Sequence, residues 1–171
     1  MFPIQLGLKA SSAPEQVASR LKYHPDVFEF FTSEVDYTAD SLEKLEEAIQ
    51  KVKSSSVKTI VLHHPMKYQG KRLELVAHPK NNAELVNFID FSTQKLLDLA
   101  KKYDCKVLVH GSYELEEAEL LEPFASIEDA RQYLFSRMDH FCHIGKDYIM
   151  FENGISKLYS YGNPDFDHLL D

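Results

Sequence analysis

The sequence predicts an α/β fold in which strands and helices alternate and the strands form one parallel sheet. Short runs of β-branched and aromatic residues recur along the chain, and stretches with a helical repeat of apolar residues separate them. Such runs are typical of strands buried on both faces of a parallel sheet. The succession of five strand–helix units leaves two architectures open. One comprises the first five of the eight units of a closed (β/α)8 barrel, and the other is an open, doubly wound sheet.

Five strands are expected where apolar runs of strand length occur. We place them at Ile4–Leu8, Val27–Phe31, Thr59–His64, Lys106–His110 and Tyr148–Phe151. Each run is short enough for a strand and too short for a helix of ordinary length. No linker or low-complexity segment divides the 171 residues, so we expect a single domain.

Four helices are expected between and after these strands, each beginning at a polar capping residue. The expected caps are Ser12 with Glu15, Asp40 with Glu43, Asn82, and Ser126 with Asp129. The first, third and fourth helices are expected to end near Lys22, Tyr103 and Ile144, and Ser54–Ser56 are expected to end the second. The second and third helices show inward stripes of apolar residues, at Leu42, Leu45, Ile49 and Val52 and at Leu85, Ile89, Leu96, Leu99 and Tyr103.

The connections between these elements are less regular. A long segment after the third strand contains a possible turn at Tyr68–Lys71 and a possible small strand at Leu73–Ala77. The segment Gly111–Ala125 carries five glutamates and is expected to be a solvated loop or short helix. A further helix is expected to begin at Asn163, which Pro164 follows.

Composition excludes several classes of protein. No run approaches the length of about 18 apolar residues that a membrane span needs, and no signal peptide is recognisable, so a cytoplasmic protein is expected. The net charge of −8 opposes binding to nucleic acid, because phosphates require clustered Lys and Arg. Cys105 and Cys142 lack paired spacing and are expected to be reduced, buried thiols.

Polar side chains follow the third, fourth and fifth strands. The sequences TIVLHH, KVLVH and YIMFEN end in His63 and His64, in His110, and in Glu152 and Asn153. Carboxyl ends of parallel strands meet at one edge, where ligands bind. Two histidines and a carboxylate suit zinc or manganese. His63 and His64 compete for one inward position, because successive strand side chains face opposite ways. His24 precedes the second strand and is expected at the other edge.

This order of residues resembles the xylose isomerase-like TIM barrels, a superfamily that includes sugar isomerases and epimerases and endonucleases of the endonuclease IV type. The resemblance covers essentially the whole chain. Glu29, in the second strand, is similar to a glutamate common in the sugar-acting members. The resemblance implies metal ligation by His63 or His64, by His110 and by Glu152, with Asn153 orienting the site. Because the family takes further ligands from strands six to eight, this chain is expected to be a partial TIM barrel from the N-terminal part of a longer protein.

The function implied by the resemblance is isomerisation or epimerisation of a sugar or sugar phosphate through an enediolate. A weakly held zinc or manganese ion would assist, and Glu152 and Glu29 would be the catalytic carboxylates. One alternative is a zinc phosphodiesterase acting on abasic DNA, which the acidic charge opposes. Another is a noncatalytic binding or assembly module. The unpaired edge strands of a partial barrel are expected to promote self-association.

Overall fold

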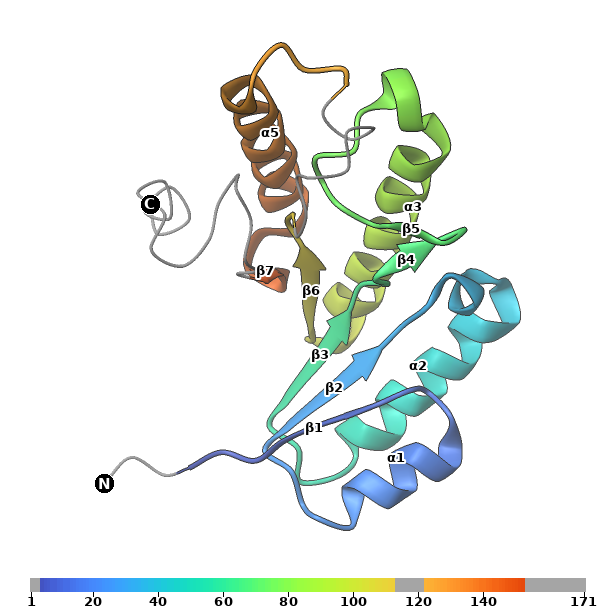
Figure 1. Ribbon diagram of the computed structural model, residues 1–171. Coiled ribbons are helices and arrows are strands. Elements are labelled where there is room, and N and C mark those ends of the chain that lie inside the picture. Colours follow the sequence, from blue (N-terminus) through green and yellow to red (C-terminus); the bar gives the residue numbers. More distant parts are fainter. Residues whose placement is uncertain (1–3, 113–121, 153–171) are drawn as a thin grey trace.

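The computed structural model describes residues 4–112 and 122–152, and its centre is a five-stranded parallel sheet. The strands lie in the order β1 (Gly7–Ala10), β2 (Val27–Phe31), β3 (Thr59–His63), β6 (Lys106–His110) and β7 (Ile149–Glu152). The described helices are α1 (Pro14–Leu21), α2 (Ala39–Lys53), α3 (Pro79–Tyr103) and α5 (Ile127–Gly145), with short 3-10 turns η1 (Glu34–Tyr37) and η2 (Lys146–Tyr148). A small antiparallel pair, β4 (Lys67–Tyr68) and β5 (Lys71–Arg72), lies outside the main sheet. Figure 1 shows the strands side by side in chain order.

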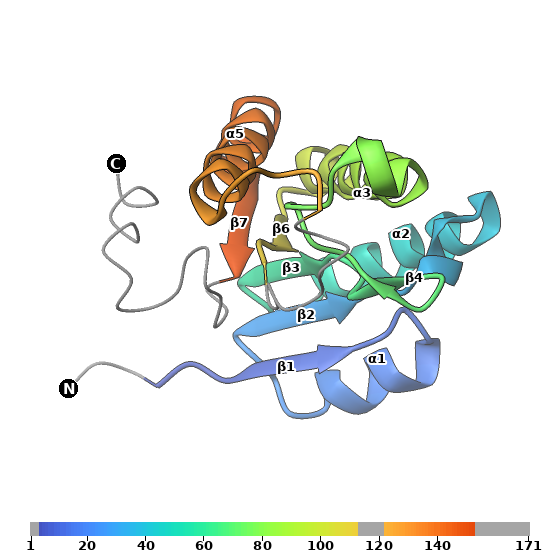
Figure 2. The ribbon, with the colours of Figure 1, turned by 45° about the horizontal axis from the view of Figure 1, so that its top comes forward.

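The helices gather on one face of this sheet. Alternate strand residues belong to the same buried cluster as the apolar sides of the helices, and they are Ala10, Phe28, Phe30, Ile60, Leu62, Val107 and Val109. The strand register places Lys9, Glu29, His63, His110 and Glu152 on the other face. Figure 2 shows the helices arranged around one side of the sheet. A doubly wound sheet has helices on both faces, so the architecture is that of a partial barrel.

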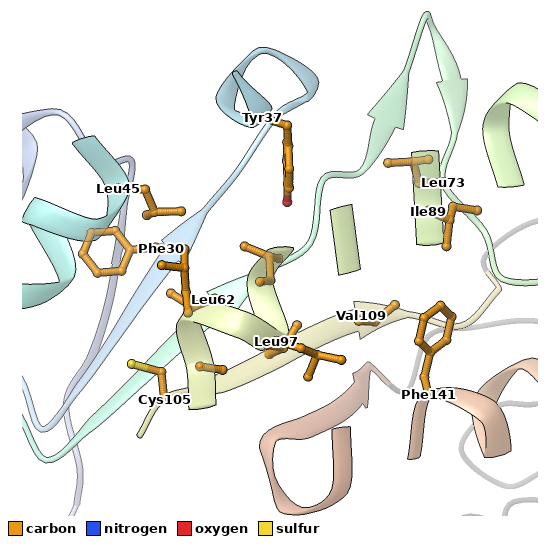
Figure 3. Close-up of a cluster of buried hydrophobic side chains, with 14 of the residues drawn as sticks. Phe30, Tyr37, Leu45, Leu62, Leu73, Ile89, Leu97, Cys105, Val109 and Phe141 are labelled. Carbon is orange, nitrogen blue, oxygen red and sulfur yellow. The ribbon is translucent and has the colours of Figure 1, made fainter. Parts of the chain in front are cut away.

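The core lies between the sheet and the helices. In Figure 3, Phe30, Leu62 and Val109 of the strands lie among helix side chains that include Leu45 and Leu97. All five are at most 2% exposed. Removing such a side chain costs about 2–5 kcal/mol of stability. This core holds the strand ends, and therefore the polar face, in place.

Three of the expected strands keep their positions, and two move. The prediction for β2 and β6 is confirmed, and β3 ends one residue early, at His63. The first strand is present, but its predicted bounds, Ile4–Leu8, are wrong, because pairing with β2 begins only at Gly7 and Ile4 is 98% exposed. Strand β7 begins at Ile149, because Tyr148 ends the turn η2.

The connection after β3 is a hairpin followed by a buried irregular segment. The predicted turn at Tyr68–Lys71 is confirmed, and Gly70 adopts the positive φ of 79° that favours glycine. The small strand predicted at Leu73–Ala77 is wrong, since the strand pairing stops at Arg72. Leu73, Leu75, Val76 and Ala77 are nevertheless part of the core.

The capping predictions succeed in one case. Ser126 caps α5 by accepting a hydrogen bond from the Asp129 amide, as expected. The caps at Ser12 and Asp40 are wrong, because Ala13 and Thr38 occupy these positions. Thr38 is available for this role because a separate turn, η1, ends directly before it.

Helix α3 begins earlier than predicted, at Pro79, with His78 as its cap. Asn82 interrupts it with non-helical dihedral angles, φ −139° and ψ 48°, so one turn precedes the main helix. The predictions for the glutamates of residues 113–121, for Asn153 and for a helix at Asn163 fall outside the described residues. Within residues 4–112 and 122–152, no helix has the length and apolar character that crossing a membrane requires.

Candidate metal centre

Three side chains converge where β3, β6 and β7 end. His63 and His110 are the last residues of β3 and β6, and Glu152 is the last residue of β7. The register pairs His110 directly with Glu152, and His63 with Leu108, two residues before His110. The side chains of all three therefore lie on the face of the sheet that the helices do not cover. The predicted convergence of two histidines and a glutamate at one edge is present in the structure.

The donor atoms of these residues lie close together. His63 Nε2 is 2.8 Å from His110 Nε2, His110 Nε2 is 3.0 Å from Glu152 Oε2, and His63 Nε2 is 3.5 Å from the same oxygen. Three donors around one tetrahedral zinc ion, each bound at about 2.0–2.2 Å, would be about 3.3–3.6 Å apart. The observed separations are near that range. The donor set therefore fits a small divalent cation with little rearrangement.

Burial keeps the histidine of β6 in the form that binds metals. His110 is 2% exposed, and burial together with the neighbouring His63 lowers its pKa to about 4, against the opposing effect of Glu152. Its imidazole is thus neutral at physiological pH. A neutral imidazole offers a lone pair, which an imidazolium lacks.

Glu29 joins this group from the neighbouring strand β2. His63 Nδ1 donates a hydrogen bond to Glu29 Oε1, and Lys9 Nζ lies 2.6 Å from the same oxygen. Lys9 Nζ is also 2.8 Å from His63 Nδ1, but two donors do not bond to each other, so the carboxylate accepts from both. Burial opposes ionisation of Glu29, yet the bonds from Lys9 and His63 outweigh it and lower its pKa.

His64 lies away from the cluster. Its Nε2 is 2.7 Å from Ser92 Oγ, and that hydroxyl donates to the Phe88 carbonyl, so His64 is the donor in this contact. Burial lowers the pKa of His64 to about 3. Of the two histidines that competed for the inward position, His63 faces the cluster and His64 belongs to the core.

A cavity of about 440 Å³ lies beside the cluster. Its wall includes His63 and Lys9, together with the exposed side chains of Phe31, Met66 and Lys67. The volume is within the usual range for small-molecule sites. The wall combines apolar surface with charged groups of both signs, since Glu34 lines it together with the two lysines, and it lies at the carboxyl edge of the sheet.

Lys9 was not among the residues that the sequence singled out. The strand prediction ended at Leu8, which placed Lys9 in a turn. In the structure it is the third residue of β1 and the register partner of Glu29. Ala10 belongs to the core, and the alternation of side chains along a strand turns Lys9 to the opposite face, which was the available signal.

Comparison with known proteins supports the fold. No protein-family model matches the chain, and no curated protein sequence matches it either. A search of solved structures finds, among others, a chain described as a D-tagatose 3-epimerase-like protein, with a TM-score of 0.61 and 19% sequence identity. The match covers 93% of this chain and 56% of that chain. The likeness confirms the parallel α/β fold, and this chain spans little more than half of the similar barrel.

Proposed function

We propose that this chain carries part of the active site of a divalent-metal-dependent isomerase or epimerase of sugars or sugar phosphates. The observation that carries the proposal is the convergence of His63, His110 and Glu152 at the carboxyl edge of the sheet. The likeness in fold to a D-tagatose 3-epimerase-like protein supports sugars as the substrate class. Activity, substrate and partners of the whole protein belong to the proposal.

The chemistry of the donor set favours zinc or manganese. Two imidazole nitrogens and one carboxylate oxygen would hold the ion and leave further coordination positions for water or substrate. A bound cation would supply Lewis acidity toward adjacent hydroxyl and carbonyl oxygens, which makes the C–H between them more acidic. Three protein ligands are expected to hold the ion weakly.

The protein groups around the cluster orient a substrate. The cavity beside His63 presents Phe31 and Met66, which are 42% and 57% exposed, to the C–H surface of a sugar. Lys67 lines the same cavity and would attract an oxygen-rich or phosphorylated substrate, whereas Lys9 is paired there with Glu29. The resemblance also implied a catalytic role for the Glu29 carboxylate. Its Oε1 is occupied by Lys9 and His63, and we infer a different role for it below.

Calorimetric titration with zinc and with manganese tests the metal site. The wild-type chain is expected to bind, and His110→Leu and Glu152→Gln are expected to abolish binding, because the first removes a nitrogen ligand and the second removes the negative charge of the oxygen ligand, each with little change in size. His24→Asn is the matched control, since His24 is exposed at the opposite edge and asparagine tolerates its φ of 49°. Equal binding by all four proteins would refute the site.

Deuterium exchange followed by proton NMR tests the reaction. Ketoses and ketose phosphates incubated in D2O with the protein and manganese are expected to exchange carbon-bound hydrogen beside the carbonyl, and Glu152→Gln is expected to stop this exchange. Metal binding without exchange on any of these substrates would favour a noncatalytic module. Metal-dependent cleavage of abasic DNA would favour the phosphodiesterase.

A further inference from the structure

We propose that Glu29, held by Lys9, is a positioning residue that fixes the tautomer and orientation of His63. The inference rests on the proposed function, because it explains how His63 becomes a metal ligand. The resemblance implied that Glu29 is a catalytic carboxylate. In the structure its contacts are with Lys9 on β1 and His63 on β3, one strand to each side.

The strand register explains why Glu29 reaches the imidazole. Glu29 is level with Lys9 on one side and with Val61 on the other, two residues before His63. Side chains two residues apart on a strand share a face, so Glu29 and His63 lie on the same side of the sheet. A diagonal contact between neighbouring strands is within reach of these long side chains.

The hydrogen bond to Glu29 selects one tautomer of His63. An ionised carboxylate only accepts hydrogen bonds, so the proton of a neutral His63 must be on Nδ1. Nε2 then carries the lone pair, and Nε2 is the atom that lies 2.8 Å from His110 and 3.5 Å from Glu152. In the other tautomer, a hydrogen on Nε2 would point into the cluster and prevent metal binding. Carboxylates that bond to ligating histidines in this way commonly affect metal affinity by about 10–100-fold.

Lys9 keeps the carboxylate charged and in place. Only 27% of the Glu29 side chain is exposed, which opposes ionisation, and the lysine 2.6 Å away offsets this cost. Lys9 approaches from β1 while His63 approaches from β3. The carboxylate is thus held between two strands.

The opposite ends of β2 and β3 offer a matched control. Asp26, directly before β2, pairs with Lys58, directly before β3, at a distance of 2.8 Å. This ion pair resembles that of Lys9 and Glu29 in kind, but it lies at the amino edge of the sheet. Its other hydrogen bond comes from the Leu6 amide and not from a histidine. A variant of Asp26 therefore shows the effect of losing a cross-strand ion pair alone, without loss of a hydrogen bond to His63.

The first experiment measures the tautomer of His63 without metal. Nitrogen-15 NMR of histidine-labelled protein at pH 8, where unperturbed imidazoles are neutral, distinguishes Nδ1–H from Nε2–H, and a His63→Leu spectrum assigns the signal. The wild type and Glu29→Gln, which keeps an acceptor oxygen, are expected to show Nδ1–H. Glu29→Met is expected to shift His63 toward Nε2–H, and Asp26→Leu is expected to change nothing. Glu29→Ala provides a second test should the methionine variant fail to fold.

The second experiment measures zinc affinity by calorimetry for the same proteins. Glu29→Met is expected to lose about 10–100-fold and Glu29→Gln much less, while Asp26→Leu keeps wild-type affinity. An unchanged tautomer in folded Glu29→Met or Glu29→Ala would overturn the inference. A changed tautomer of His63 in these variants supports the positioning role of Glu29, whether or not the wild type binds zinc. Absence of zinc binding by the wild type would instead refute the proposed metal site.

Discussion

Gly145 offers a test of how tightly α5 is joined to the strand that carries Glu152. It is the last residue of α5, and a Cβ at this position would lie 2.9 Å from both Cβ and Cγ2 of Ile149 and 3.2 Å from Cδ2 of Leu97. Carbon atoms in contact are normally about 3.5–4.0 Å apart. Because the Cβ of Ile149 is fixed to the backbone of β7, relief requires β7 or the end of α5 to move.

The expected cost of Gly145→Ala follows from these contacts. Overpacking of a core typically costs about 1–3 kcal/mol, and the higher helix propensity of alanine returns at most about 1 kcal/mol. A net loss of about 1–2 kcal/mol in the free energy of unfolding is therefore expected. Gly7→Ala is the matched control, since its Cβ would meet only Val27 Cβ, at an ordinary 3.8 Å. That variant is expected to be neutral or stabilised by up to about 1 kcal/mol.

Urea unfolding followed by circular dichroism measures both variants against the wild type. The midpoint is expected to fall for Gly145→Ala and to stay or rise for Gly7→Ala, with similar slopes. Because Ile149 begins the strand that ends at Glu152, Gly145→Ala is also expected to weaken zinc binding. A Gly145→Ala protein as stable as Gly7→Ala would show that the helix end and β7 are loosely packed, and the reasoning would fail.

Other expectations address pH, thiols, partners and assembly. Burial lowers the pKa of His64 to about 3, so its contribution to stability is complete above about pH 6.5 and decreases as the pH falls toward 3. Between pH 7 and pH 5 the contribution of His64 to the free energy of unfolding should fall by about 2 kcal/mol. If urea unfolding shows that a His64→Gln chain loses as much stability as the wild type over this pH range, the expectation is contradicted. Cys105 is buried, as expected, and burial raises its pKa to about 11, whereas the expectation of a buried thiol is wrong for Cys142, which is exposed. A thiol reagent at pH 8 should therefore label Cys142 rapidly and Cys105 only after unfolding. The net charge of −8 predicts no binding to duplex DNA at physiological salt, and submicromolar affinity with a steep salt dependence in fluorescence anisotropy would argue otherwise. Within the described part, β1 and β7 each have a strand neighbour on one side only, so self-association is expected, and light scattering that gives a stable monomer would speak against it.

Local patterns in the sequence determined the elements and the chemistry at their ends. The runs rich in aromatic and β-branched residues located β2 and β6 to the residue, because such side chains favour strands that pack on a core. The order of His63, His110 and Glu152 after consecutive strands predicted the cluster, since parallel strands end at a common edge. These conclusions depend on neighbours in the chain and on a general rule about strand direction. These conclusions did not require knowledge of which helix and strand surfaces pack against each other.

Tertiary structure decided what depends on contacts between distant segments. The placement of all described helices on one face separated the partial barrel from the doubly wound sheet, and no local pattern encodes which face a helix covers. The choice of His63 over His64 followed from the register of β3 and from Ser92 on α3. Lys9 belongs to the site because the pairing of β1 with β2 begins at Gly7, three residues after the start of the apolar run at Ile4, and therefore includes Lys9. Register is set by the packing of whole strands, which is why the sequence alone left these positions open.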